Sequence, residues 1–130
     1  MERPPRHLQS AEGWYIAIVI ERFEYYDEDV ADPTRECTAW ENTILVQADS
    51  HDMAYEKAAK IGKATEGVEC TDDSGRKGEW KFVGLGELLP VYEKIEDGAE
   101  LMWMSHESIT VEDANNLASH KSSLAVFRKE

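Results

Sequence analysis

Cysteine is scarce in this sequence, and its two copies lie far apart. Cys37 and Cys70 are the only cysteines in 130 residues, and neither belongs to a Cys-x-x-Cys motif. This spacing excludes the usual cysteine-based zinc sites. We expect both residues to be free thiols in a cytoplasmic protein, although the sequence is also compatible with a disulfide between them.

Long apolar runs are missing as well. The longest run, Trp14 to Ile20, has seven residues, whereas a membrane-spanning helix needs about 20. Residues 1–13 are polar and contain no apolar stretch, so they do not resemble a secretory signal. We therefore expect a cytoplasmic protein without a membrane partner.

Basic residues are outnumbered throughout the chain. Lys and Arg total 14 against 27 Asp and Glu, which gives a net charge of −13 at pH 7. The imbalance is even, with a net charge of −6 over residues 1–65 and −7 over residues 66–130. Binding to phosphate groups needs clustered Lys and Arg, so we expect no nucleic-acid partner. The charge favours solubility and suits a partner protein with a basic surface.

Motifs for metal binding, cofactor binding and nucleophilic catalysis are also missing. The four histidines form no His-x-x-x-His pair, and the acidic stretch 27–32 lacks the ligand order and central glycine of a calcium loop. The sequence contains no Gly-x-Ser-x-Gly elbow, and Gly84-Leu85-Gly86 is too short for a phosphate loop. We therefore predict no catalytic residue, no metal ligand and no cofactor.

Carboxylates on predicted strands near tryptophans leave acid–base chemistry open. Such chemistry needs one acid whose pKa is raised by an apolar pocket and one that stays ionised. The sequence does not show which two residues would pair, and exposed charge on a strand face is the simpler explanation. The residues concerned are Glu21, Glu24, Glu41 and Glu79.

Alternating apolar positions indicate an α+β fold. We expect residues 1–13 to form a disordered N-terminal arm and residues 14–130 to form a single α+β domain. The pattern predicts a mainly antiparallel twisted sheet of four to five strands, with one helix packed on a face and a second, C-terminal helix. The predicted order is β-β-α-β-β-β-α, with strands at 14–25, 37–48, 66–71, 79–85 and 101–104, and helices at 49–62 and after Thr110. Asp49 or Ser50 is expected to cap the first helix and Thr110 the second, and residues 72–75 are expected to form a tight turn.

Four tryptophans, one on each of four predicted strands, are the most informative feature of the sequence. They are Trp14, Trp40, Trp80 and Trp103. Either they fill the core beneath the alanine-rich helix, or they line a concave surface, because tryptophan is enriched at binding hot spots. In the second case the expected interaction surface consists of Trp40, Glu41, Trp80, Met102, Trp103 and Met104.

The first predicted strand is apolar on both of its sides. A single helix covers only one face of a sheet, so the second helix or a partner chain has to cover the other face. Homodimerisation is therefore expected.

The order of these segments resembles a known family. A Trp-Tyr strand, a strand that starts at Trp40-Glu41, the alanine-rich helix, a Trp80-Lys81-Phe82-Val83-Gly84 strand and Glu96-Asp97-Gly98 follow one another. Over roughly residues 14–118 this order is similar to the small bacterial proteins grouped as domain of unknown function 4288. The resemblance implies a small cytosolic bacterial domain, and it brings no activity, cofactor or site residue.

Three functions fit these observations. We favour a small acidic, non-catalytic module that binds a protein partner, or a second copy of itself, through an acidic and aromatic face. The first alternative is a small ligand-binding protein or enzyme with a pocket between helix and sheet. The second alternative is an acidic mimic that inhibits a nucleic-acid-binding protein.

Overall fold

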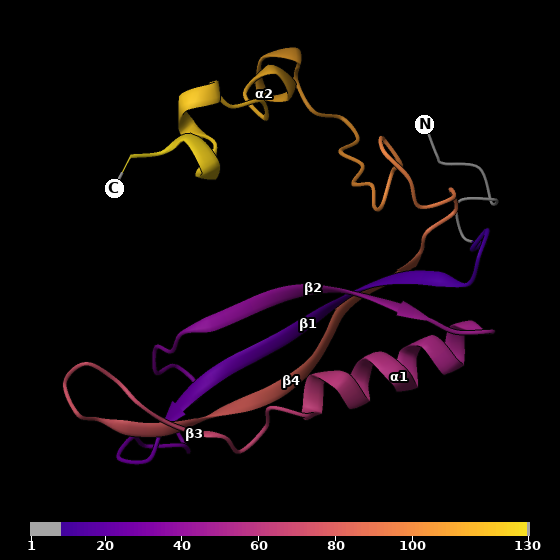
Figure 1. Cartoon of the computed structure of the whole chain (residues 1–130). Coiled ribbons are helices and arrows are strands. Elements are labelled where there is room, and N and C mark those ends of the chain that lie inside the picture. The colour runs from indigo at the N-terminus through magenta and orange to yellow at the C-terminus, as the bar shows by residue number, and fades with distance from the viewer. Residues whose placement is uncertain (1–8, 130) are drawn as a thin grey trace.

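The computed structural model describes residues 9–129 and contains one sheet with one long helix against it (Figure 1). The predicted α+β class is confirmed. Two short 3-10 helices, η2 and η3, follow the last α-helix. The elements are β1 (Trp14–Tyr25), β2 (Ala39–Gln47), α1 (His51–Lys63), β3 (Glu69–Thr71), β4 (Lys77–Pro90), α2 (Val111–Asn115), η2 (Lys121–Ser123) and η3 (Ala125–Phe127).

The sheet has the strand order β2-β1-β4-β3, and every neighbouring pair is antiparallel. β1 lies in the interior of the sheet, pairing with β2 from Trp14 to Arg22 and with β4 from Tyr15 to Tyr25. β1 has buried apolar side chains on both faces: Tyr15 and Ala17 belong to the core cluster beneath α1, and Ile16, on the other face, is only 3% exposed.

Helix α1 packs on one face of the sheet through very small residues. Its N-terminus is capped as predicted, because the Ser50 hydroxyl accepts a hydrogen bond from the Met53 amide at 3.1 Å. Ala54 and Ala58 are fully buried and belong to one core cluster with Ala17. Tyr15 and Val46 complete that cluster and supply its bulk. Side chains of this size let the helix axis approach the sheet closely.

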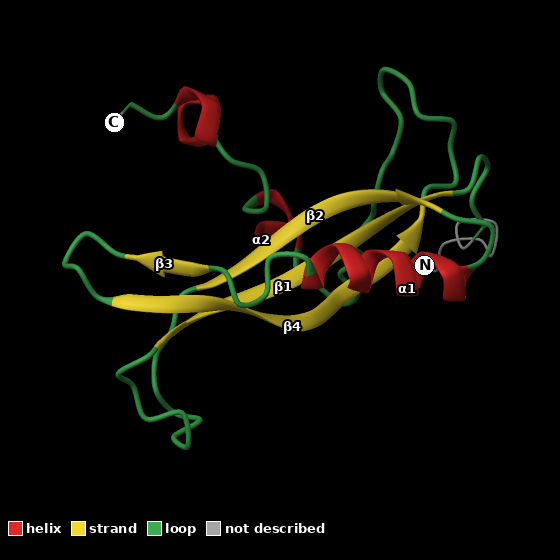
Figure 2. Ribbon diagram, turned by 60° about the horizontal axis from the view of Figure 1, so that its bottom comes forward, coloured by secondary structure: helices red, strands yellow, loops and turns green. Residues whose placement is uncertain are grey.

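Strand β4 is longer than predicted and contains two irregularities in its pairing with β1. The register shifts between Ile18 and Val19 and again between Ile20 and Glu21, next to Gly84 and Gly86. Gly84 has a φ of +151°, a conformation that side chains rarely adopt. The strand continues through both shifts, because bulges bend a strand without ending it, and the sheet is visibly curled (Figure 2).

The C-terminal part of the chain leaves the sheet after β4, on the side opposite to α1 (Figure 1). Residues 101–104, expected as a strand, form neither a helix nor a strand, because the chain rises over a face of the sheet instead of pairing along one of its edges (Figure 1). Thr110 caps α2 as predicted. However, α2 has only five residues and none is buried, so it does not cover the sheet as expected. None of the described helices has the length and apolar character needed to cross a membrane.

The tryptophans do not fill the space beneath α1, which corrects one of the two predictions made for them. Trp14 precedes Tyr15 on β1, and strand alternation points it to the face opposite the helix. Trp40 and Trp80 lie on the helix face but beyond the end of α1, and Trp103 lies outside the sheet. The prediction failed because the small helix side chains approach the sheet so closely that Tyr15, Ala17 and Val46 fill the space beneath them.

Part of the N-terminal arm, residues 1–8, lies outside the described residues. The remaining residues, 9–13, hydrogen-bond to the end of the sheet. The Ala11 amide donates to the Val91 carbonyl at 3.3 Å, and the Gly13 carbonyl accepts from the Ala48 amide at 2.8 Å. Order in the described chain therefore begins before Trp14.

Candidate functional site: an aromatic cleft beside the helix

The face that carries α1 has one uncovered end, and four aromatic rings gather there. The helix ends at Lys63, so the region where β3 pairs with β4 extends past it (Figure 1). The rings belong to Phe23, Tyr25, Trp40 and Trp80, and they border an open cleft of about 290 Å³ that also touches Cys70 and Asp72.

Strand register brings these rings together from three segments of sequence. Alternation on β1 places Phe23 and Tyr25 on the same face, and the ladder sets Phe23 opposite Trp80 on β4. Tyr25 lies opposite Gly78, where a Cβ would collide with the Glu24 carbonyl group, so only glycine allows the two strands to approach this closely. Trp40 approaches from β2, on the other side of β1.

The rings form a series that runs from the core to the solvent. Phe23 is only 8% exposed and lies 5.2 Å from Trp80, ring centre to ring centre. Trp40 meets Trp80 edge to face at 6.3 Å and is 55% exposed. Phe23 is thus the floor of the cleft and Trp40 its exposed wall, an arrangement in which a ligand can cover apolar surface without any core rearrangement.

Tyr25 and Arg76 form the opposite wall. The Arg76 guanidinium lies 3.8 Å from the centre of the Tyr25 ring and donates to both carboxylate oxygens of Asp27, with its shortest contact at 2.7 Å. The hydrogen bonds to Arg76 hold the pKa of Asp27 below its usual value. One face of Tyr25 is therefore already occupied by a cation from the same chain.

Asp72 places a negative charge at the rim of the cleft. Its carboxylate accepts hydrogen bonds from the Ser74 hydroxyl at 2.6 Å, the Arg76 amide at 3.0 Å and the Tyr25 phenol at 2.9 Å. These bonds, led by the one from Ser74, lower the pKa of Asp72 to about 2. The tight turn predicted at residues 72–75 is confirmed, and Gly75 takes the expected positive φ of +88°. Asp72 is thus ionised at neutral pH and forms no ion pair with any described residue.

Of the six residues predicted as an interaction surface, the structure brings two together. Trp40 and Trp80 are in contact, whereas Glu41 follows Trp40 and points to the opposite face of β2. The other three, Met102, Trp103 and Met104, belong to the irregular segment after β4. Sequence reasoning did not select Phe23, Tyr25 or Asp72 for this surface, because register between distant strands is not visible in one sequence.

Three of the four carboxylates considered for acid–base chemistry are held by partners, and the fourth, Glu41, is exposed. Glu24 and Glu79 are cross-strand neighbours, and Lys81 binds them at 3.7 Å and 2.5 Å. The hydrogen bond from Lys81 lowers the pKa of Glu79. Glu21 lies on the helix face, where it accepts hydrogen bonds from Thr65 and Asn42. Glu79 is stabilised in its ionised form by this contact, the opposite of what a general acid at neutral pH needs.

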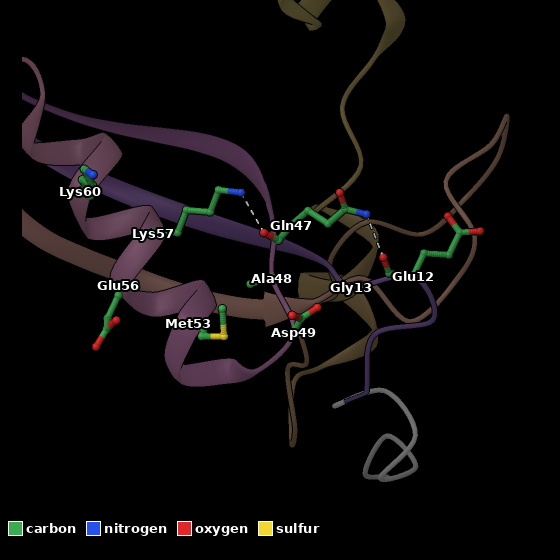
Figure 3. A pocket seen from close by; sticks show the side chains of 9 residues that line it. All are labelled: Glu12, Gly13, Gln47, Ala48, Asp49, Met53, Glu56, Lys57 and Lys60. Atoms are coloured by element: carbon green, nitrogen blue, oxygen red, sulfur yellow. Dashed lines mark hydrogen bonds between the residues drawn. The ribbon is translucent and has the colours of Figure 1, made fainter.

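A second hollow lies along the first turns of α1, next to the end of β2 (Figure 3). It is an open groove of about 520 Å³. Its two sides are tied together by the Lys57 amine, which donates to the Gln47 carbonyl at 2.9 Å, and by the Gln47 amide, which donates to the Glu12 carbonyl at 3.1 Å. No three histidine, cysteine or carboxylate side chains converge as metal ligands within the described part of the chain.

The fold and the cleft together define a class: a small α+β domain with a four-stranded antiparallel sheet, one covering helix and an aromatic hollow beside it. The family model described as Domain of unknown function (DUF4288) matches residues 14–103. The chain belongs to this family. The match ends before residue 118, the limit of the resemblance seen in the sequence, and excludes α2. No curated protein and no solved structure matches the chain.

Proposed function

We propose that this protein is a non-catalytic interaction module whose aromatic cleft receives one basic side chain of a partner protein. The observation that carries the proposal is that Trp40 and Trp80, in contact with each other, line the same cleft as the ionised carboxylate of Asp72. Aromatic faces attract a desolvated cation, and a nearby carboxylate adds a directional acceptor for its N–H groups. Lysine or arginine meets both requirements.

The size of the cleft favours a side chain over a small-molecule ligand. Ligand pockets generally enclose about 300–1,000 Å³, whereas this cleft is open and measures about 290 Å³. An open hollow of this size accommodates one long side chain, with the rest of the partner resting on the surrounding surface. The net charge of −13 would also steer a basic partner toward the molecule.

An interaction within the chain supports this choice of ligand. Arg76 stacks on Tyr25 at the edge of the same cleft, so the ring surfaces here already bind a guanidinium. A partner's lysine or arginine would use the remaining faces of Trp40 and Trp80 in the same way. We further propose a bacterial, cytoplasmic setting for this interaction, which suits the free thiols of Cys37 and Cys70.

The proposal is tested with short glycine–serine peptides that carry one central residue: lysine, its neutral analogue norleucine, or glutamate. Binding is measured by isothermal titration calorimetry near physiological salt. Wild-type protein is compared with Trp40→Ala and with Tyr55→Ala, a matched control because Tyr55 lies on α1 and is 56% exposed. The lysine peptide should bind best, and Trp40→Ala should weaken it by roughly tenfold, the factor for about 1.4 kcal/mol.

Two results would contradict the proposal. Equal binding of the lysine and norleucine peptides would show that the cleft does not recognise a cation. Equal weakening by Trp40→Ala and Tyr55→Ala would show that binding occurs elsewhere on the acidic surface.

A further inference from the structure

The face of the sheet opposite α1 carries a half-buried apolar patch with acidic borders. Ile18 and Ile20 of β1 point to this face, and Leu45 of β2, on the same face, is 44% exposed. Glu41 is the cross-strand partner of Ile20, and Glu87 is that of Ile18. Neither glutamate forms an ion pair with a described residue. We name these five residues the open patch.

The second feature is the C-terminal arm, residues 104–129, which lies beyond the family match at 14–103. Every residue of the arm is exposed, including several large apolar ones. The elements η2 and η3 contact each other, and no arm element packs extensively on the sheet. The exposed apolar side chains are Met104, Ile109, Val111, Leu117, Leu124, Val126 and Phe127.

The chain exposes more surface than a compact monomer of its mass. Its accessible area is 10026 Å² for 14.8 kDa, whereas the scaling law for folded monomers gives roughly 7,000 Å². Each partner in a standard protein–protein interface buries about 800 Å². The surplus is therefore large enough to supply a stable interface.

Charge makes the end of the arm complementary to the open patch. Residues 114–129 contain no carboxylate and carry Lys121, Arg128 and Lys129, although Glu130 follows them and the whole chain is strongly acidic. The Lys121 amine lies 5.0 Å from the centre of the Phe127 ring, so apolar and basic groups form one cluster. Such a cluster is complementary to the open patch, where Ile18 and Ile20 lie between Glu87 and Glu41.

We propose that two copies of this chain exchange their C-terminal arms, each arm docking on the open patch of the other copy. A two-fold arrangement uses the same contact twice, so both arms and both patches are covered at once. A second copy is favoured over docking within one chain because the arm already rises on this side of its own sheet, and yet no arm element packs extensively on that sheet (Figure 1). The site is distinct from the aromatic cleft, which lies on the α1 face.

The test is the mass of the full-length protein over a concentration series, by analytical ultracentrifugation. Wild type should be a dimer that dissociates on dilution. Leu45→Glu in the patch and Phe127→Glu in the arm should each raise the dimer dissociation constant by at least about tenfold, the factor for about 1.4 kcal/mol. Met53→Glu is the matched control, since Met53 is 52% exposed on α1, and should leave the dimer unchanged.

Mixing the two variants distinguishes exchange from other dimers. The Leu45→Glu protein keeps a normal arm and the Phe127→Glu protein keeps a normal patch. In an equimolar mixture the normal arm of the first can dock on the normal patch of the second, so heterodimers should form at concentrations where each variant alone is monomeric. Circular dichroism verifies that both variants fold. Glu41→Lys replaces Leu45→Glu in the patch, and Lys121→Glu replaces Phe127→Glu in the arm, if either does not fold. Trp40→Ala should not change the dimer, which keeps this test independent of the proposed cleft function.

Three outcomes would overturn the proposal: a wild-type monomer at every concentration, a dimer insensitive to both variants, or a mixture without heterodimers where wild type is fully dimeric. A wild-type monomer would instead indicate that the arm docks on the sheet of its own chain or does not dock at all.

Discussion

The guanidinium of Arg76 covers the ring of Tyr25 at 3.8 Å and joins the last residue of β1 to the turn between β3 and β4. The same guanidinium binds Asp27 through both carboxylate oxygens. One side chain therefore fixes three segments around the aromatic cleft.

Replacing Arg76 by lysine should loosen the rim of the cleft without unfolding the core. Lysine keeps the charge but cannot stack as a plane or bind both oxygens of Asp27 in parallel. We expect faster amide hydrogen exchange in residues 26–36 and 72–76, and unchanged exchange in β1. Lys77→Arg is the control, because Lys77 makes only a long contact of 3.9 Å to Glu69. Unchanged exchange at the rim would show that Arg76 does not hold it.

The free energy of unfolding should fall as the pH drops from about 4 toward 2, with Asp72 as one cause. The folded-state pKa of Asp72 is about 2 and its ordinary value is 3.8. The ionised form is therefore favoured by folding, and this stabilisation is present above the ordinary pKa and lost as pH falls through the folded-state pKa. Urea unfolding across this range should show a weaker pH dependence in Asp72→Asn than in Asp73→Asn. Identical pH dependence in the two variants would contradict the assignment.

Gly62→Ala should destabilise the protein, although alanine favours helix. The substitution gains about 1 kcal/mol of helix propensity. A Cβ at this position would lie 2.5 Å from Cε1 of Phe82 and 3.0 Å from Cγ1 of Val19, and overpacking of this kind costs about 1–3 kcal/mol. We expect a net loss near 1 kcal/mol in chemical denaturation, with Lys63→Ala as the exposed control. A gain in stability would mean that the Phe82 ring moves aside freely.

The two ends of the aromatic series should differ sharply in their effect on stability. Phe23 is 8% exposed, so Phe23→Ala should cost about 3–5 kcal/mol as a large core truncation. Trp40 is 55% exposed, so Trp40→Ala should cost less than about 1 kcal/mol. Thermal unfolding of both variants checks this ordering. Comparable losses would place Trp40 in the core and remove it as a binding wall.

The sequence was sufficient for the features that depend on local pattern. Alternation on β1 and β2 assigned each residue to a face, and the cap at Ser50 and the turn at residues 72–75 followed from side-chain hydrogen bonding. These features involve neighbours in the chain, so a single sequence contains the information that determines them.

Features that depend on distant pairing could not be predicted in the same way. Tryptophan is large enough to suit a core or a surface, and only the register of β1 against β2 and β4 placed Trp40 and Trp80 in one cleft and Trp14 on the opposite face. The segment 101–104 has a strand-like composition, yet it forms no ladder with the sheet. Tertiary context decided both cases.

The most direct test of the cleft uses the four indole N–H signals of the tryptophans in a two-dimensional NMR spectrum. Single substitutions of tryptophan by phenylalanine assign them, and the lysine peptide is then titrated into the wild-type protein. The account predicts shifts at Trp40 and Trp80, on the cleft, and none at Trp14, on the opposite face. Shifts of equal size at all four indoles, or at Trp14 alone, would contradict it.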